Sequence, residues 1–101
     1  MAELIRSARF DRWLKRLRDP EARARILVRL RRLSLGNPGD IKPVGSGISE
    51  LRISYGPGYR IYLVAAEQDR WILLNGGSKR TQVRDIESAR RLAQEWKDQH
   101  G

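Results

Sequence analysis

The chain has 101 residues, of which 40% are hydrophobic, and it contains no cysteine and a single histidine. These values indicate one compact domain over residues 1–101 and exclude disulfides, thiol nucleophiles and metal sites built on cysteine or clustered histidines. The net charge of +9 is uneven, because residues 1–33 carry 11 Lys and Arg against 4 Asp and Glu. This surplus indicates an anionic partner, either nucleic acid, an acidic protein or a membrane surface.

The first predicted helix covers the segment FDRWLKRL, residues 10–17, where apolar side chains recur on one helical face. Ser7 is its expected N-cap. Leu4 and Ile5, just before it, could form a short opening strand. No apolar run approaches the roughly 20 residues of a membrane helix, and the N-terminus lacks an apolar signal-peptide core. We therefore expect a cytoplasmic protein without a membrane partner.

The second predicted helix covers DPEARARILVRLRRL, residues 19–33. Asp19 is the expected cap, Pro20 suits the first helical position, and Gly36 is expected to end the helix. Because the connection to the first helix is short, the two should form an antiparallel hairpin. Residues 36–47, rich in Gly and Pro, are expected to be a connecting loop.

Residues 49–63, SELRISYGPGYRIYL, alternate in polarity on both sides of Gly-Pro-Gly, which predicts a β-hairpin. With these three residues as the loop, the facing pairs are Tyr55 with Tyr59, Ser54 with Arg60, and Arg52 with Tyr62. A bulge at the turn would shift this register. In the predicted pairing, Arg52, Arg60 and Tyr62 share the polar face of the hairpin.

Residues 70–77, RWILLNGG, are predicted to form a third, covered strand, and residues 85–97 a final helix with Asp85 as its cap. The predicted fold class is therefore α+β in two layers. It has two N-terminal helices in a hairpin, a small antiparallel sheet of three to four strands, and a C-terminal helix.

Three stretches in this order, FDRWLKRLRD, RARILVRLRRLSLGNPGDIKPVGSGISELRISYGPGYRIYL and LLNGGSKRTQVRDIESA, resemble the RelE/ParE superfamily of bacterial toxins. The resemblance is greater to the HigB-like addiction module killer proteins, which are related to phage Gp49-like proteins. It implies a RelE-like fold and a cognate antitoxin, expected to be a small helix-turn-helix protein. RelE- and HigB-type members cleave mRNA on the ribosome, whereas ParE-type members poison DNA gyrase.

RelE-like enzymes cleave RNA by attack of the 2′-OH on the adjacent phosphate and use Lys, Arg and Tyr, so we expect no cofactor and no metal. The resemblance places Arg60 as a phosphate clamp, although it could instead pair with Glu50. Arg52 would bind phosphate or orient the 2′-OH, or else only contact Tyr62. The catalytic candidates are Arg60, Arg80, Lys79, Arg52 and Tyr62, with Lys79 and Arg80 either phosphate contacts or a charged turn.

One departure from the RelE pattern concerns the tyrosine that these enzymes place early in the final helix. Ile86 occupies the matching position in this chain. A phenol from Tyr62, Tyr55 or Tyr59, or the carboxylate of Asp85, would have to replace it. The general base therefore stays open at this point.

The two basic helices supply the expected RNA contacts. They could rest on RNA, receive an acidic amphipathic segment of the antitoxin, or simply be solvated. The candidate RNA-binding residues are Arg9, Arg12, Lys15, Arg16, Arg23 and Arg29. The leading interpretation is a toxin that cleaves mRNA on the ribosome, and the alternatives are a gyrase inhibitor or an inactive basic binding module.

Overall fold

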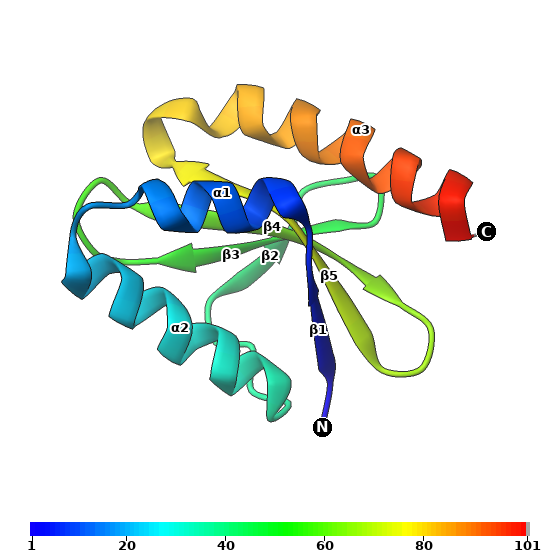
Figure 1. Ribbon diagram of the computed structural model, residues 1–101, viewed down its shortest axis with the longest axis horizontal. Coiled ribbons are helices and arrows are strands. Elements are labelled where there is room, and N and C mark those ends of the chain that lie inside the picture. Colours follow the sequence, from blue (N-terminus) through cyan, green and yellow to red (C-terminus); the bar gives the residue numbers. More distant parts are fainter. Residues whose placement is uncertain (101) are drawn as a thin grey trace.

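The structure is a computed structural model that describes residues 1–100. Its elements in chain order are β1 (Glu3–Arg6), α1 (Ala8–Arg16), α2 (Pro20–Ser34), β2 (Ile41–Pro43), β3 (Ile48–Ile53), β4 (Tyr59–Ala66), β5 (Arg70–Ser78), the 3-10 turn η1 (Lys79–Thr81) and α3 (Gln82–His100). The strands form one sheet in the order β1-β5-β4-β3-β2 (Figure 1). The predicted α+β class, with a C-terminal helix, is confirmed.

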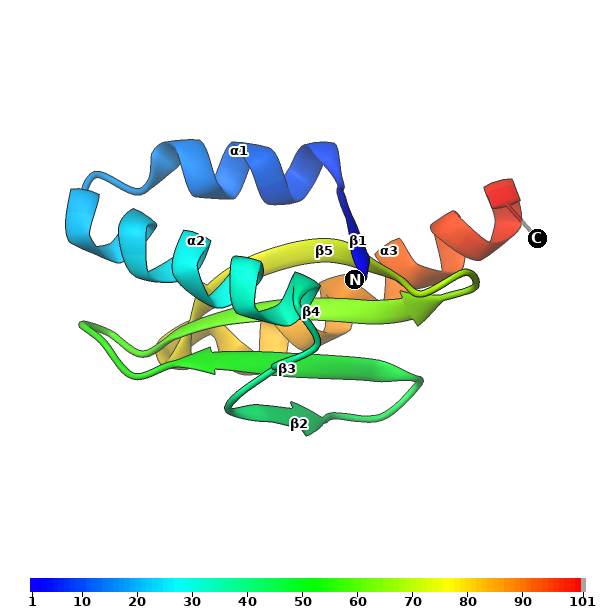
Figure 2. The ribbon, with the colours of Figure 1, turned by 90° about the horizontal axis from the view of Figure 1, so that it is seen from below.

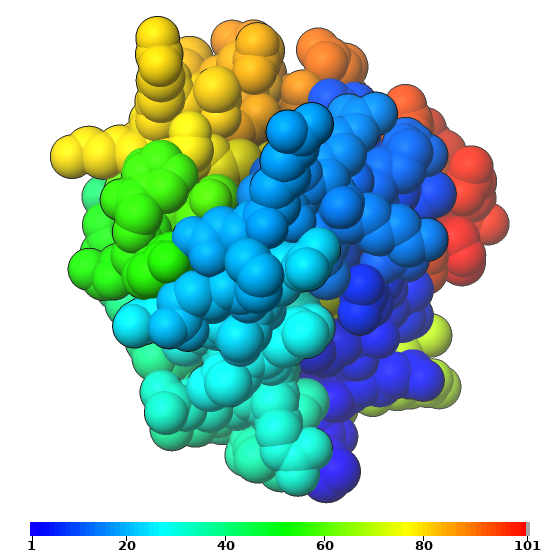
Figure 3. Space-filling view, turned by 60° about the vertical axis from the view of Figure 1, so that its left-hand side comes forward, coloured from blue at the N-terminus to red at the C-terminus, as the bar shows by residue number. Residues whose placement is uncertain are grey.

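The helices cover both faces of the sheet, so the prediction of two layers is wrong and the domain has three. On one face α1 and α2 pack around Phe10, Ile61 and Leu73. On the other face α3 packs on Tyr62 and Leu74. As predicted, α1 and α2 run in opposite directions (Figure 2). Figure 3 shows the side of the molecule on which these two helices lie, coloured blue to cyan.

The sheet is mixed and has five strands, which corrects the prediction of an antiparallel sheet of three to four. β1 pairs in parallel with β5, from Glu3 opposite Arg70 to Arg6 opposite Leu73. β2 lies inside the segment predicted to be a loop and pairs with β3, with Ile41 opposite Leu51. β1 and β2 are very short and lie at the two edges of the sheet. A strand this short does not need an alternating pattern of apolar and polar residues, so the sequence gives little sign of its pairing.

Local signals set the helix boundaries. Ser7 caps α1 by accepting the Phe10 N–H at 3.0 Å, and Asp19 caps α2 by accepting the Glu21 N–H at 2.9 Å. Gly36 follows the end of α2 with a φ of 89°, a conformation that glycine adopts without strain. These three expectations are confirmed. The prediction that Asp85 caps the final helix is wrong, because α3 begins at Gln82.

The predicted hairpin register is wrong by two residues. Arg52 lies opposite Arg60 and Ile53 opposite Tyr59, so the strands are joined by the five residues 54–58. Within this loop, residues 55–58 form a tight turn, in which the Gly58 N–H donates a hydrogen bond to the Tyr55 carbonyl oxygen at 3.1 Å. A shift of two preserves the alternation of faces. Arg52, Arg60 and Tyr62 therefore still share one face.

α3 covers one part of that shared face. Tyr62 is fully buried beneath α3, and Glu50, beside it in the sheet, is 1% exposed. The prediction of a polar face at Tyr62 is therefore wrong, whereas Arg52 stays on the surface and Arg60 is half-buried. Among residues 1–100, no helix is both long and apolar enough to cross a membrane.

Candidate nucleic-acid interface

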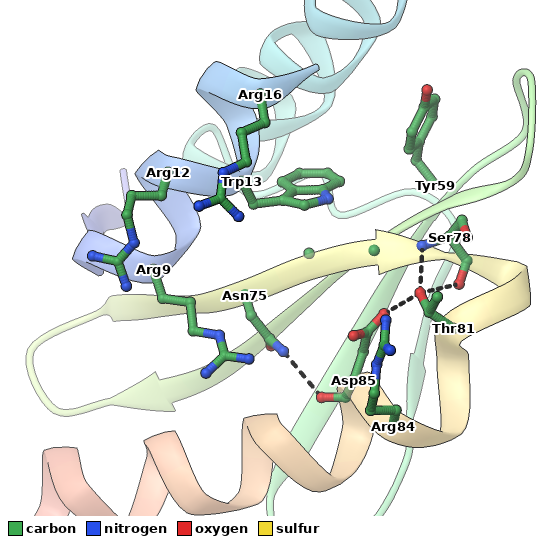
Figure 4. A pocket seen from close by; sticks show the side chains of 12 residues that line it. Arg9, Arg12, Trp13, Arg16, Tyr59, Asn75, Ser78, Thr81, Arg84 and Asp85 are labelled. Atoms are coloured by element: carbon green, nitrogen blue, oxygen red, sulfur yellow. Dashed lines mark hydrogen bonds between the residues drawn. The ribbon is translucent and has the colours of Figure 1, made fainter. Parts of the chain in front are cut away.

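A cleft of about 520 Å³ lies beside the last residues of β5 (Figure 4). β1 pairs with β5 only as far as Leu73, so Asn75 to Ser78 have no strand neighbour on that side. The wall above this free edge is α1, and the opposite wall is the start of α3. Strand edges carry backbone groups that can bind a ligand, and here they form the floor of the cleft.

Two glycines allow both walls to close on the floor. A Cβ atom at Gly76 would lie 2.4 Å from the ring of Trp13, which comes from α1. A Cβ atom at Gly77 would lie 1.8 Å from Oδ2 of Asp85, which comes from α3. Successive strand residues point to opposite faces, so the indole and the carboxylate hold β5 from both sides. Side chains at these two positions would force the walls apart.

Four arginines make the cleft strongly basic. Arg9, Arg12 and Arg16 follow helical spacing on α1, and Arg84 projects from α3 on the other wall (Figure 4). Within residues 1–100, none of the four side chains is in a hydrogen bond or an ion pair. Their guanidinium groups remain available for bidentate contacts with phosphate.

Among residues 1–100, Asp85 is the one carboxylate that lines the cleft, and its position is fixed by neighbours. It is 8% exposed, and its Oδ2 accepts a hydrogen bond from the Thr81 hydroxyl. That hydroxyl accepts the Ser78 N–H at 3.2 Å, and the Asn75 amide donates to the backbone oxygen of Asp85 at 3.0 Å. η1 and the first turn of α3 are thereby tied to the end of β5.

Aromatic rings add a stacking surface to the basic cleft. The rings of Trp13 and Tyr59 meet edge to face, with centroids 6.2 Å apart and an interplanar angle of 69°. Both side chains line the cleft, and the Tyr59 hydroxyl points away from Asp85 (Figure 4). Aromatic faces beside arginines are typical of surfaces that bind unpaired nucleotides.

The predicted RNA-binding residues separate into three groups. Arg9, Arg12 and Arg16 meet in the cleft, whereas Lys15 is exposed on the same helix outside it. The remaining two, Arg23 and Arg29, donate hydrogen bonds to backbone carbonyl groups of the protein itself. Arg23 donates to the carbonyl oxygen of Leu17 at 3.0 Å.

Arg29 joins α2 to the loop before β2 and to β3. Its guanidinium donates to the carbonyl oxygens of Pro38 at 3.1 Å and Asp40 at 3.3 Å, and also to that of Arg52. Burial lowers the pKa of Arg29 below that of a free guanidinium. Three hydrogen bonds to backbone carbonyl groups therefore hold this side chain within the protein.

The predicted catalytic residues do not converge on one point. Arg52 forms an ion pair with Asp40 at 2.9 Å on the surface. The Tyr62 hydroxyl donates to Glu50 at 3.1 Å, and burial together with the charge of Glu50 raises the pKa of Tyr62. Arg60 is half-buried on the same face, opposite Gly77 of β5.

Lys79 and Arg80 form η1 and are both exposed. They line a second hollow of about 430 Å³ with the first turn of α3, and Arg84 and Thr81 border both hollows. The two cations therefore lie at the border of the basic cleft and not within it.

Five residues that line the cleft are not among the predicted site residues: Trp13, Asn75, Ser78, Thr81 and Arg84. The signal that points to them is the Gly76–Gly77 pair at the end of an apolar strand, since paired glycines within a strand mark a close approach of other groups.

Comparison with known proteins gives the family of this chain. The sequence pattern of the Gp49-like phage-derived proteins (DUF891) matches residues 12–96. A protein of Haemophilus influenzae (strain ATCC 51907 / DSM 11121 / KW20 / Rd), described as uncharacterized, is 52% identical over 86 residues, which are 85% of this chain and 87% of the relative. The chain belongs to the Gp49-like family of phage-derived proteins, which is a RelE-like toxin family. Membership in a toxin–antitoxin family implies an antitoxin as partner.

Proposed function

We propose that this protein is the toxin of a type II toxin–antitoxin system, closest in type to HigB, and that it cleaves mRNA on the ribosome. The observation that carries the proposal is the cleft in which four unpaired arginines from two walls face an open strand edge. A phosphodiester bound there would meet guanidinium groups from both sides. Family membership supports the toxin role and the need for an antitoxin.

The proposed reaction is an attack of the RNA 2′-oxygen on the adjacent phosphorus. The O2′–P bond forms while the P–O5′ bond breaks, a base takes the 2′-hydroxyl proton, and the 5′-oxygen gains a proton as it leaves. Negative charge on the phosphoryl oxygens rises in the transition state, so fixed cations accelerate the step. Arg12, Arg16 and Arg84 are proposed to supply this stabilisation.

Asp85 is our candidate for the general base. It is the carboxylate lining the cleft, and its contact with Thr81 holds it in one orientation. Base catalysis by a positioned carboxylate typically contributes about 10²–10⁴-fold. Tyr62 is too deeply buried to reach an RNA strand, and the Tyr59 ring is better placed for stacking than for proton transfer.

The other predicted residues have supporting roles in this proposal. Lys79 and Arg80 extend the positive surface beyond the cleft, where RNA on one side of the cleaved bond would pass. Arg60 lies opposite Gly77 in the sheet and does not line the cleft, so we assign it no direct contact with phosphate. Arg52 is held by Asp40 and is proposed to have no contact with RNA.

The test is induced expression followed by primer extension on translated transcripts. The cleft variant Arg12→Ala/Arg16→Ala is compared with the charge-matched variant Arg31→Ala/Arg32→Ala on α2. We expect discrete cuts in translated mRNA for the wild type and the α2 variant and none for the cleft variant. Intact transcripts with DNA breaks and an SOS response would support gyrase inhibition instead. Intact RNA and DNA with normal growth would indicate an inactive binding module.

A further inference from the structure

A second cavity, here called the distal hollow, lies at the far end of α3 from the basic cleft. It has a volume of about 520 Å³, and its lining includes Val64, Ala66, Arg70, Trp96, Lys97 and His100. Figure 1 places the C-terminal end of α3 beside the β4–β5 turn, at the opposite end of the helix from its first turn. Arg84 of the cleft and Lys97 of the distal hollow are about 20 Å apart along the helix axis, at a rise of about 1.5 Å per residue. Among residues 1–100, the two cavities share no lining residue.

Two stacked aromatic rings form one side of the distal hollow. Trp96 and His100 lie one turn apart on α3, with ring centroids 3.5 Å apart and an interplanar angle of 16°. The Nδ1 atom of His100 is 3.0 Å from the Trp96 carbonyl oxygen, and this contact holds the imidazole over the indole. Trp96 is half-buried against the apolar core beneath α3, whereas His100 is exposed. The outer face of the imidazole therefore remains open to a third planar ring.

Small side chains of β4 leave the opposite side of the distal hollow open. Val64 and Ala66 belong to the apolar cluster beneath α3, and Ala66 lies opposite Arg70 in the sheet. An alanine at this position leaves a space below the last turn of α3 that a larger apolar side chain would fill. The domain therefore ends in a partly apolar space that its own side chains do not close.

Cations border the distal hollow on both sides. Arg70 comes from the sheet, and its Nε donates to the carbonyl oxygen of Glu67 at 3.0 Å. Lys97 comes from α3 and is exposed. Within residues 1–100, the terminal nitrogens of Arg70 and the Lys97 amine are in no hydrogen bond or ion pair. Glu67 is the one carboxylate in this lining, so positive charge is in excess.

We propose that the distal hollow binds an unpaired nucleotide of single-stranded RNA at a site separate from the cleft. The base stacks on the His100 ring above the apolar floor, and the phosphates on its two sides pair with Arg70 and Lys97. A nucleotide within a strand has a phosphate on each side, which matches cations on two walls, whereas a free nucleoside monophosphate has one. The stacked rings favour a planar base over a peptide side chain. Only the choice of RNA over DNA rests on the proposed function.

The experiment titrates an unstructured RNA decamer into the full chain carrying Arg12→Ala/Arg16→Ala, which weakens the cleft, and follows NMR shifts. We expect shifts of the Trp96 indole N–H and of the backbone amides of residues 64–70 and 96–100, whether or not the wild type cleaves mRNA. A nucleoside monophosphate should bind at least tenfold more weakly, and a DNA decamer of the same sequence no more tightly than RNA. An absence of shifts at these residues, or tighter binding of either comparison ligand, would overturn the proposal.

A pair of charge-matched variants in the same background tests the cations. Arg70→Ala/Lys97→Ala should weaken RNA binding at the distal hollow roughly tenfold or more, because both phosphate contacts are lost. Arg31→Ala/Arg32→Ala removes the same charge from α2, outside both cavities, and should change this binding by less than about twofold. Equal losses in the two variants would reduce the binding to general charge attraction and contradict the proposal.

A third variant tests the space itself. Ala66→Phe fills the distal hollow without a change of charge, and we expect RNA binding there to weaken at least fivefold. Thermal unfolding checks that the fold is kept, and the cation variants decide the question if Ala66→Phe does not fold. An acidic peptide with leucine side chains that shifts the same signals at lower concentration than the RNA would assign the hollow to a protein partner and contradict the proposal.

Discussion

The basic cleft and the α3-covered face of the β3–β4 hairpin contain the same kinds of side chain, but in different states. On the covered face, Glu50 accepts hydrogen bonds from Tyr62 at 3.1 Å and Gln82 at 2.7 Å, and all three lie under or within α3. In the cleft, the side chains of Arg12 and Arg84 are in no hydrogen bond or ion pair with any of residues 1–100. The comparison teaches that access and pairing, more than residue type, separate structural from ligand-binding charges in this fold.

The largest effect is expected from removing the α1 arginines of the cleft. Arg9→Ala/Arg12→Ala/Arg16→Ala should weaken binding of a single-stranded RNA oligonucleotide by roughly 10²–10⁴-fold, because each charge-assisted phosphate contact contributes about 1.5–3 kcal/mol and such losses are only partly additive. The salt dependence of binding should also become shallower. Fluorescence anisotropy at several salt concentrations measures both quantities.

A charge-matched control tests whether RNA affinity depends on where the arginines lie or only on the net charge. Arg18→Ala/Arg31→Ala/Arg32→Ala removes the same charge from residues outside the cleft. We expect it to change RNA affinity by less than about fivefold, which reflects long-range electrostatics only. Equal losses in the two triple variants would erase the distinction between cleft and surface.

The second effect concerns the floor of the cleft. Gly77→Ala places a Cβ atom against the Asp85 carboxylate, and we expect a loss of roughly 1–3 kcal/mol in the free energy of unfolding, as for other overpacked sites. Urea denaturation measures it. In the Asp85→Ala background the same change should cost clearly less, since the obstructing carboxylate is gone. If the losses of unfolding free energy from Gly77→Ala and Asp85→Ala are additive, α3 does not approach β5 through the contact between Asp85 and Gly77.

The third effect tests the covered face. Tyr62→Phe removes a donor from the buried Glu50 carboxylate and should reduce the free energy of unfolding by about 1–2 kcal/mol while leaving RNA affinity unchanged. Tyr55→Phe, which removes a more exposed hydrogen bond to Asp19, should cost less. A loss of RNA binding in Tyr62→Phe with the fold intact would give the covered face a functional role.

Tyr62 also predicts a dependence on pH. Its pKa is raised in the folded state, so its contribution to stability is complete below the unfolded tyrosine pKa of about 10 and is lost as the pH rises further. Wild type should therefore lose stability above pH 10 more steeply than Tyr62→Phe. Parallel curves from urea denaturation between pH 8 and 11 would contradict this assignment.

The smallest effect is expected for Arg52. Its ion pair with Asp40 is exposed, with 36% and 54% of the two side chains accessible, so Arg52→Ala should cost at most about 1 kcal/mol and less in high salt. RNA binding should be unchanged. A tenfold loss of RNA affinity in Arg52→Ala would show that Arg52 contributes to RNA binding and would contradict this prediction.

Features with a local cause could be predicted from the sequence. The caps at Ser7 and Asp19 and the antiparallel pair of helices follow from patterns within a few residues. Arg9, Arg12, Lys15 and Arg16 were predicted to share one face of α1, and the three arginines line the cleft whereas Lys15 does not. The hairpin faces were also predicted, because alternation survives a register error of two.

Features that depend on distant residues could not be predicted in the same way. The sequences of β1 and β5 do not indicate that these two strands pair in parallel. Burial of Tyr62 and Glu50 depends on which side α3 packs, and alternation of polarity does not determine this. Arg84 joins the cleft only because Thr81 and Asp85 fix the first turn of α3 over Gly77.

The pairing of the first strand with the last one has a consequence for the order of assembly during synthesis. Glu3 has no sheet partner until Arg70 has been made, and α1 cannot meet the opposite wall until α3 follows. Contacts this distant in sequence form late and slow the folding of a domain. A nascent chain thus carries the arginines of α1 long before it has a cleft, which is complete only when α3 has been made.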